Sequence, residues 1–178
     1  MSVNSRKLVG VFKSGDESTI IRAIQFCSEE IKNHLSDFLN EERILVPIPR
    51  SSPLTDGALW PSLVIANKLV EHGFGRDVFC SIKRSKAVPK SSSNYSAETR
   101  TTVEYNINRL KIEKVLITST SIKLIDDVIT LGRTAYACAE VFHQAYPDTD
   151  IKFLAMVRTK GFEEIDRYFD PYVGSISY

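Results

Sequence analysis

Short apolar runs alternate with segments of helical periodicity along most of the 178 residues. Strands of a buried parallel sheet are continuous apolar runs, whereas an amphipathic helix repeats its apolar residues every three or four positions. The alternation therefore predicts an α/β fold with a mainly parallel central sheet flanked by helices. The predicted strands are Leu8–Phe12, Ile44–Pro49, Val78–Ile82, Val115–Thr118, Ile122–Ile125 and Ile151–Val157, and the predicted helices are residues 17–39, 58–72 and 134–146.

Composition limits the classes of function. Lys and Arg number 23 against 22 Asp and Glu, and this net charge of +1 gives no general attraction to nucleic acid or an anionic membrane. No run of about 18 apolar residues predicts a membrane span, and the first residues lack the apolar core of a signal peptide. We therefore expect a cytoplasmic protein, with one domain and a sizeable core.

Two polar loops follow predicted strands: residues 50–57 follow Ile44–Pro49, and residues 127–134 follow Ile122–Ile125. Ligands of open α/β sheets bind beyond the carboxyl ends of the strands, where the strand order reverses, so we expect these loops to form a site. The segment Lys83–Thr99 is rich in Ser, Lys and Arg and has no periodicity. We interpret it as a long exposed loop, which in a compact domain is usually functional or disordered.

The turn after the apolar run Ile122–Ile125 combines two adjacent acids with a glycine at the start of a predicted helix. Amide groups at a helix N-terminus favour phosphate, and Gly132 allows close approach or a positive φ. Asp126 and Asp127 would repel phosphate but suit sugar hydroxyls or a hydrated metal ion. With hydroxyl donors at positions 130 and 134, the segment predicts a sugar-phosphate site. The structural alternative is an ordinary strand followed by an Asp-capped turn.

The segment Ile125–Thr134 resembles the signature with which type I phosphoribosyltransferases bind phosphoribosyl pyrophosphate (PRPP). That signature is an apolar strand, two acids, two apolar residues, and a Thr- or Ser-rich turn with Gly and a closing Thr. Two positions differ: Lys123 stands where the family prefers an apolar residue, and Leu131 replaces a usual Thr or Ser. A lysine is tolerable near a strand start or edge, and Leu131 still contributes its backbone amide.

The likeness covers about residues 44–158. The segment Val46–Arg50 is similar to the first strand and loop of the ComF/GntX-like branch, whereas in Asp56–Pro61 only Gly57 and the following helix match. Weaker resemblances lie at Ile82–Arg84, Val88–Lys90 and Ala97–Arg100. The resemblance implies a Rossmann-like type I phosphoribosyltransferase fold over residues 1–178, with a small hood from residues 1–43 or 159–178.

The resemblance also implies an enzyme that transfers phosphoribose to or from a nitrogenous base, with pyrophosphate release and Mg²⁺. Asp126 and Asp127 would bind the ribose hydroxyls, assist catalysis and face Mg²⁺, largely through substrate and water. Lys83 and Arg84 would stand at the base of a flexible loop that folds over the site. The 5′-phosphate would bind to Thr130, Leu131, Gly132, Arg133 and Thr134, and the pyrophosphate to Pro49, Arg50, Ser51 and Ser52.

Other interpretations stay open. Leu131 and the altered segment 56–61 also suit a catalytically weak PRPP- or nucleotide-sensing module that regulates a partner or assists nucleic-acid processing. A plain Rossmann-like nucleotide binder has little support, because no GxGxxG follows a strand. Arg50, Lys83 and Arg84 could be solvated charges, and Trp60 and the tail aromatics core residues. The acceptor base and the oligomeric state are not readable, although homodimers are common in the family.

Overall fold

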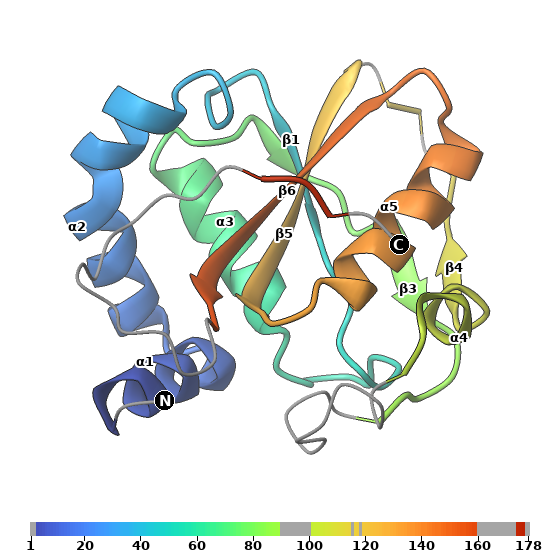
Figure 1. Cartoon of the computed structure of the whole chain (residues 1–178). Coiled ribbons are helices and arrows are strands. Elements are labelled where there is room, and N and C mark those ends of the chain that lie inside the picture. The colour runs from blue at the N-terminus through green and yellow to red at the C-terminus, as the bar shows by residue number, and fades with distance from the viewer. Residues whose placement is uncertain (1–2, 90–100, 115, 118, 160–173, 177–178) are drawn as a thin grey trace.

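The computed structural model describes residues 3–89, 101–114, 116–117, 119–159 and 174–176. Its centre is a four-stranded sheet in the order β2-β1-β5-β6, flanked by helices, and every pairing in it is parallel (Figure 1). The predicted α/β architecture is thereby confirmed. The strands of this sheet are β1 (Ile44–Pro47), β2 (Asp77–Val78), β5 (Ser121–Ile129) and β6 (Asp150–Arg158).

The strand order reverses between β1 and β5. From β1 the chain passes through α3 (Pro61–Glu71) to β2 on one side, and from β5 it passes through α5 (Arg133–Ala145) to β6 on the other. The Ile48 amide donates to the Ile125 carbonyl at 2.8 Å, and beyond this bond β5 pairs with β6 alone. The carboxyl ends of β1 and β5 therefore form a topological switch point.

Helices cover both faces of the sheet. On one face α1 (Val3–Ser14), α2 (Glu17–Leu35) and α3 pack over Leu45 and Ile125. On the other face, α5 and a two-stranded antiparallel sheet of β3 (Ile82–Arg84) and β4 (Leu110–Ile112) pack over a second cluster that includes Leu124. Successive strand residues point to opposite faces, which is why neighbours in β5 join different clusters.

Most predicted elements are present with shifted ends. The helix expected over 17–39 ends at Leu35, and Leu39 is buried in the turn that follows it. Gly73 stops α3 with a φ of 79°, the left-handed backbone that glycine accommodates. The helix expected over 134–146 is α5, and the run Ile151–Val157 lies within β6.

Three strand predictions were wrong. Leu8–Phe12 lies in helix α1, because a run of five apolar residues suits either structure and Phe12 can reach the core from a helix. Val78–Ile82 is divided between β2 and β3, which belong to different sheets. Of Val115–Thr118 the structure describes residues 116–117, which are in no strand, and Leu116 is 88% exposed.

Neither β4 nor the short helix α4 (Val103–Ile107) that precedes it was predicted. Thr102 caps this helix by accepting a hydrogen bond from the Tyr105 amide at 3.1 Å. Both elements are too short to produce a periodic pattern of their own. Within the described part of the chain, no helix has the length and apolar character needed to cross a membrane.

Candidate functional site

The two predicted loops meet at the carboxyl edge of the sheet, at the switch point between β1 and β5 (Figure 1). The second loop is shorter than predicted, because β5 continues to Ile129 in pairing with β6, so Asp126 and Asp127 lie within the strand. Ser62, near the start of α3, donates from its hydroxyl to Asp126 Oδ1 at 3.1 Å. Trp60 donates from Nε1 to the Ile48 carbonyl at 2.7 Å. These bonds join the loop after β1 to the end of β5, so the edge is one connected site.

Asp126 is an inward-facing acid. Its Oδ1 accepts from the Ser62 hydroxyl and, at 2.9 Å, from the Asp127 amide. Burial raises the pKa of the Asp126 carboxyl well above its ordinary 3.8, and the charge of Asp127 and a hydrogen bond between the two carboxyl groups raise it further. The two donors to Oδ1 lower the pKa but do not outweigh these effects. Asp126 therefore keeps its proton over a wider pH range than an exposed aspartate.

Of the two acids, Asp127 suits Mg²⁺ better than Asp126 does. A carboxyl group that retains its proton is a poor ligand for a hard cation, so Asp126 does not suit direct coordination. Asp127 is half-buried, and its Oδ1 accepts from the Val128 amide at 2.8 Å. Among the described residues, no three His, Cys, Asp or Glu form a metal-binding group. Any Mg²⁺ here would depend mainly on a bound phosphate, with Asp127 nearby.

The turn between β5 and α5 depends on Gly132. This residue precedes α5 with φ 77° and ψ 2°, the left-handed conformation, and supplies no side-chain cap. A β-carbon at this position would lie 2.6 Å from Cδ1 of Ile176, so the C-terminal segment also approaches the turn closely. The tail aromatics Tyr168, Phe169, Tyr172 and Tyr178 lie outside the described residues.

The other predicted phosphate-binding residues belong to the same turn. Thr130 and Leu131 are exposed, with Leu131 at 40%, whereas Arg133 and Thr134 are half-buried in the first turn of α5. Arg133 donates from Nη1 to the Thr101 carbonyl at 3.5 Å. The turn is thus joined to the residues that follow the segment 90–100, which is itself outside the described part of the chain.

The predicted pyrophosphate loop is held by backbone contacts. Pro49 is buried, and the Arg50 carbonyl accepts a hydrogen bond from Arg84 Nε at 3.1 Å. The Ser51 carbonyl accepts from the Val88 amide at 2.7 Å. Ser52 is half-buried in the same loop.

Trp60 is a core residue. It is 6% exposed and its indole nitrogen is bonded to the chain at Ile48. The core interpretation of this tryptophan is therefore confirmed, and the ring does not offer a stacking surface to a base.

The start of the predicted loop Lys83–Thr99 requires a correction, because Lys83 and Arg84 lie in a strand that ends where the loop would begin. Both belong to β3, and Arg84 is 5% exposed, with burial lowering the pKa of its guanidinium. Lys83 pairs with Glu113 at 2.6 Å on the surface. Arg84 Nη1 donates to Asn106 Oδ1 at 3.4 Å. A run of polar residues suggested a loop, but β4 pairs with this segment and buries every second side chain.

Two residues of the site were not anticipated. Ser62 fixes Asp126 from a position 64 residues earlier in the chain. Asn106 is 1% exposed and donates from Nδ2 to the Thr101 hydroxyl and to the Thr102 carbonyl, both at 2.9 Å, while it accepts from Arg84. Neither lies in a recognisable motif, and a serine or asparagine alone carries no signal in a single sequence.

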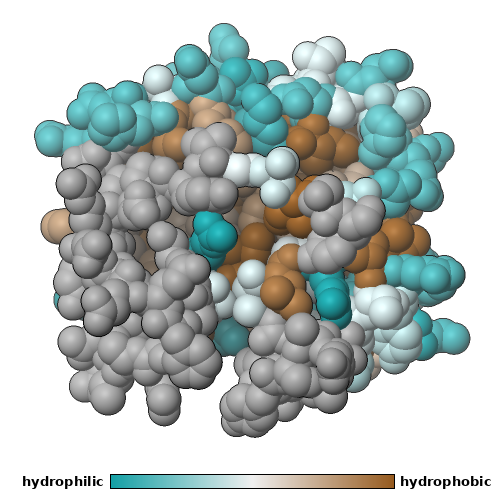
Figure 2. All heavy atoms as spheres, viewed as in Figure 1, coloured by the Kyte–Doolittle hydropathy of each residue, from teal (hydrophilic) through white to brown (hydrophobic). Residues whose placement is uncertain are grey.

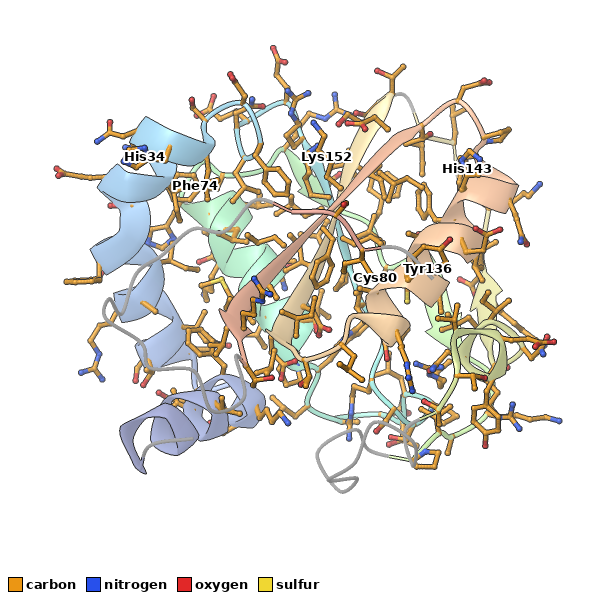
Figure 3. The ribbon with its side chains drawn as sticks, in the orientation of Figure 1. His34, Phe74, Cys80, Tyr136, His143 and Lys152 are labelled. Carbon is orange, nitrogen blue, oxygen red and sulfur yellow. The ribbon has the colours of Figure 1, made fainter. Side chains whose placement is uncertain are left out.

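A shallow groove of about 300 Å³ lies between α5 and the start of β6. Figure 3 labels Tyr136 and His143, which project from α5 on this side, and Figure 2 shows hydrophobic residues near the middle of the same face, with hydrophilic residues along its top and right. None of the predicted site residues lines the groove, so it has no part in the predicted PRPP site. Its lining residues are Tyr136, Ala139, Glu140, His143, Thr149, Asp150 and Ile151.

In comparisons with known protein families and with curated proteins, the chain matches no family model and no curated sequence. The functional conclusion therefore rests on the switch-point geometry, the paired acids and the glycine turn.

Proposed function

We propose that the protein is a phosphoribosyltransferase of the type I fold, which binds PRPP at the carboxyl edge of its sheet and transfers phosphoribose to or from a nitrogenous base. The observation that carries this proposal is the position of Asp126, Asp127 and the Gly132 turn at the switch point between β1 and β5. Sheets of this kind bind ligands at that point, and few other arrangements call for adjacent acids beside a phosphate-accepting helix start.

Each part of the substrate has a suitable partner. The turn Thr130–Thr134 would hold the 5′-phosphate through backbone amides and hydroxyls, favoured by the dipole of α5. Asp127 would accept hydrogen bonds from the ribose hydroxyls. Asp126, held by Ser62 and with its pKa raised by burial, would set the position of Asp127 through the hydrogen bond between their carboxyl groups. The loop Pro49–Ser52 would face the pyrophosphate.

The reaction breaks the bond between C1 of the ribose and the pyrophosphate oxygen, and forms a bond from C1 to a ring nitrogen of the base. Positive charge develops on the ribose ring as the bond breaks, and the carboxylate of Asp127 beside the ring would stabilise that charge. Negative charge develops on the leaving pyrophosphate, and the Arg50 guanidinium and the backbone amides of its loop would stabilise that charge. Mg²⁺ bound with the substrate supplies further neutralisation of that leaving group.

The proposal is tested by calorimetric titration of the protein with PRPP in the presence of Mg²⁺. Asp127→Asn is expected to weaken binding by tenfold or more, since a hydrogen bond to a charged group contributes about 1.5–3 kcal/mol. Asp148→Asn is the matched control, because Asp148 is an exposed acid in the turn before β6 and should leave the affinity unchanged. Unchanged affinity in Asp127→Asn, or no binding by the unsubstituted protein, would contradict the proposal.

The alternative function is a sensing module that binds PRPP without catalysis. Two features of the turn support this alternative. Leu131 places a 40% exposed hydrophobic side chain where the family uses a hydroxyl, and Ile176 lies against Gly132. Pyrophosphate release with PRPP and a panel of nucleobases separates the two functions. Release with any base supports the enzyme, whereas tight PRPP binding without release, together with salt-dependent binding of single-stranded nucleic acid, supports the sensor.

A further inference from the structure

Three cations gather at the amino edge of the sheet, at the opposite end of the strands from the candidate site. Lys123 on β5 and Lys152 on β6 are direct partners in the register, and Lys123 is also opposite Leu45 of β1. Arg43 immediately precedes β1 and is near enough for its charge to act on Lys123. Figure 3 shows Lys152 toward the amino ends of the strands.

One carboxylate, that of Asp150, is shared by two of these cations. Asp150 Oδ2 lies 3.8 Å from Lys123 Nζ and 3.7 Å from Lys152 Nζ, so one acid is shared by two ammonium groups at long range. Among the described residues, Asp150 is the acid whose charge acts on Lys123. Among the charges that act at Lys123, the three cations, counting Lys123 itself, exceed the one acid by two.

Two of the three cations, Lys123 and Arg43, also have donor atoms that are buried from water. Lys123 is 1% exposed, and it donates to the Ser121 hydroxyl at 2.8 Å and lies 5.1 Å from the centre of the Phe38 ring. Arg43 Nε is buried and has no hydrogen-bond partner within the described part of the chain, although Nη2 of the same residue donates to the Asp37 carbonyl at 3.2 Å. Buried charges in proteins are normally paired, so the Lys123 ammonium and the buried Arg43 Nε favour an anionic partner.

We propose that Arg43, Lys123 and Lys152 form a binding site for a small oxyanion with two negative charges, of the size of inorganic phosphate or sulfate. Such an ion matches the excess charge and supplies acceptors for the Arg43 guanidinium and the half-exposed Lys152 ammonium. Lys123 lies beneath and contributes through its charge. This site is independent of the proposed PRPP site, because it lies at the other edge of the sheet and shares no residue with it.

The test is thermal unfolding of the full chain in increasing inorganic phosphate, compared with chloride at the same ionic strength and pH 7. Phosphate is expected to raise the Tm of the unsubstituted protein, because a ligand that binds only the folded state stabilises it. Lys152→Ala should weaken the apparent phosphate affinity by about tenfold or more, the effect of removing one charged hydrogen-bond partner. Lys111→Ala, which removes an exposed cation of β4, is the control and should respond like the unsubstituted protein.

A second variant separates this site from the proposed PRPP site, where phosphate could also bind. Thr134→Val changes the turn before α5 and leaves the amino-edge cations intact. A phosphate response that survives in Thr134→Val and is lost in Lys152→Ala supports the proposal. A response that is retained in Lys152→Ala, or that is absent from the unsubstituted protein, overturns it, and neither result bears on PRPP binding at the other edge.

Discussion

Replacing Lys123 by methionine should make the protein more stable at neutral pH. The side chain is 1% exposed, and burial, only partly offset by Asp150, lowers the pKa of its ammonium from 10.5 to about 8. At about 1.4 kcal/mol for each pH unit, keeping the group charged at pH 7 costs the folded state about 3 kcal/mol. Methionine removes this term but loses the hydrogen bond to Ser121, which contributes about 1 kcal/mol. The expected net gain is about 2 kcal/mol.

The pH dependence of this gain identifies its cause. Because the pKa of Lys123 is lower in the folded state than in the unfolded state, the folded protein loses this proton first as the pH rises from about 8 to 10.5. In that window the unfolded state binds more protons, so the stability of the unsubstituted protein increases with pH relative to the variant. The advantage of Lys123→Met should therefore shrink above pH 8 and disappear by about pH 10.5.

The assay is urea-induced unfolding between pH 7 and 10.5 in chloride buffers, since phosphate would stabilise the unsubstituted protein if it binds beside Lys123. Lys111→Met is the control, because removal of an exposed lysine should change the unfolding free energy by less than about 0.5 kcal/mol at every pH. A variant that is less stable than the unsubstituted protein at pH 7, or a difference that does not depend on pH, would refute the desolvation argument.

Three further predictions concern the carboxyl edge. Gly132→Ala should lower the unfolding free energy by about 1–2 kcal/mol because its backbone is left-handed, and by a further amount because the new β-carbon would contact Ile176. Adding Ile176→Ala should relieve only the contact with Ile176, which a double-mutant cycle in urea would measure. Trp60→Phe should lose about 1 kcal/mol with its bond to Ile48, and an unchanged urea midpoint would count against that bond. Asp126→Asn should gain stability relative to the unsubstituted protein as pH rises above 3.8, because the folded state holds the Asp126 proton more tightly than the unfolded state does. Equal pH profiles in thermal melts would contradict this.

The sequence predicted the elements whose patterns are strong and local. The strand around Val46 is a continuous apolar run, and in β5 the apolar residues Ile122, Leu124 and Ile125 are likewise fully buried. The start of α2 is also locally determined, because Asp16 caps this helix by accepting from the Thr19 amide at 3.0 Å. Gly132 has the positive φ that the turn before α5 requires. In each case residues close in sequence determine the structure.

The failures arose where distant parts of the chain decide. Phe12 belongs to an apolar run that fits a strand or a helix, and its packing against the α2 and α3 cluster is a tertiary effect. Arg84 is in a polar segment, yet pairing with β4 buries it. A lysine at position 123 suits a strand start or edge, and Lys123 does lie near the start of β5. However, β5 is an inner strand between β1 and β6, and the Lys123 side chain is fully buried.

Strand β5 carries two groups that burial disfavours, one toward each end. Lys123 lies near its amino end with a lowered pKa, and Asp126 lies toward its carboxyl end with a raised pKa. Apolar residues at both positions would make a more stable central strand, since buried ionisable groups are seldom net stabilising. Ionisable groups with perturbed pKa values concentrate at functional sites. The amino edge of this sheet has more cations than acids around Lys123, and at the carboxyl edge Asp126 and Asp127 share a hydrogen bond between their carboxyl groups. The fold itself does not require these two groups, whereas the PRPP and the oxyanion proposed at the two edges of the sheet would each account for one of them.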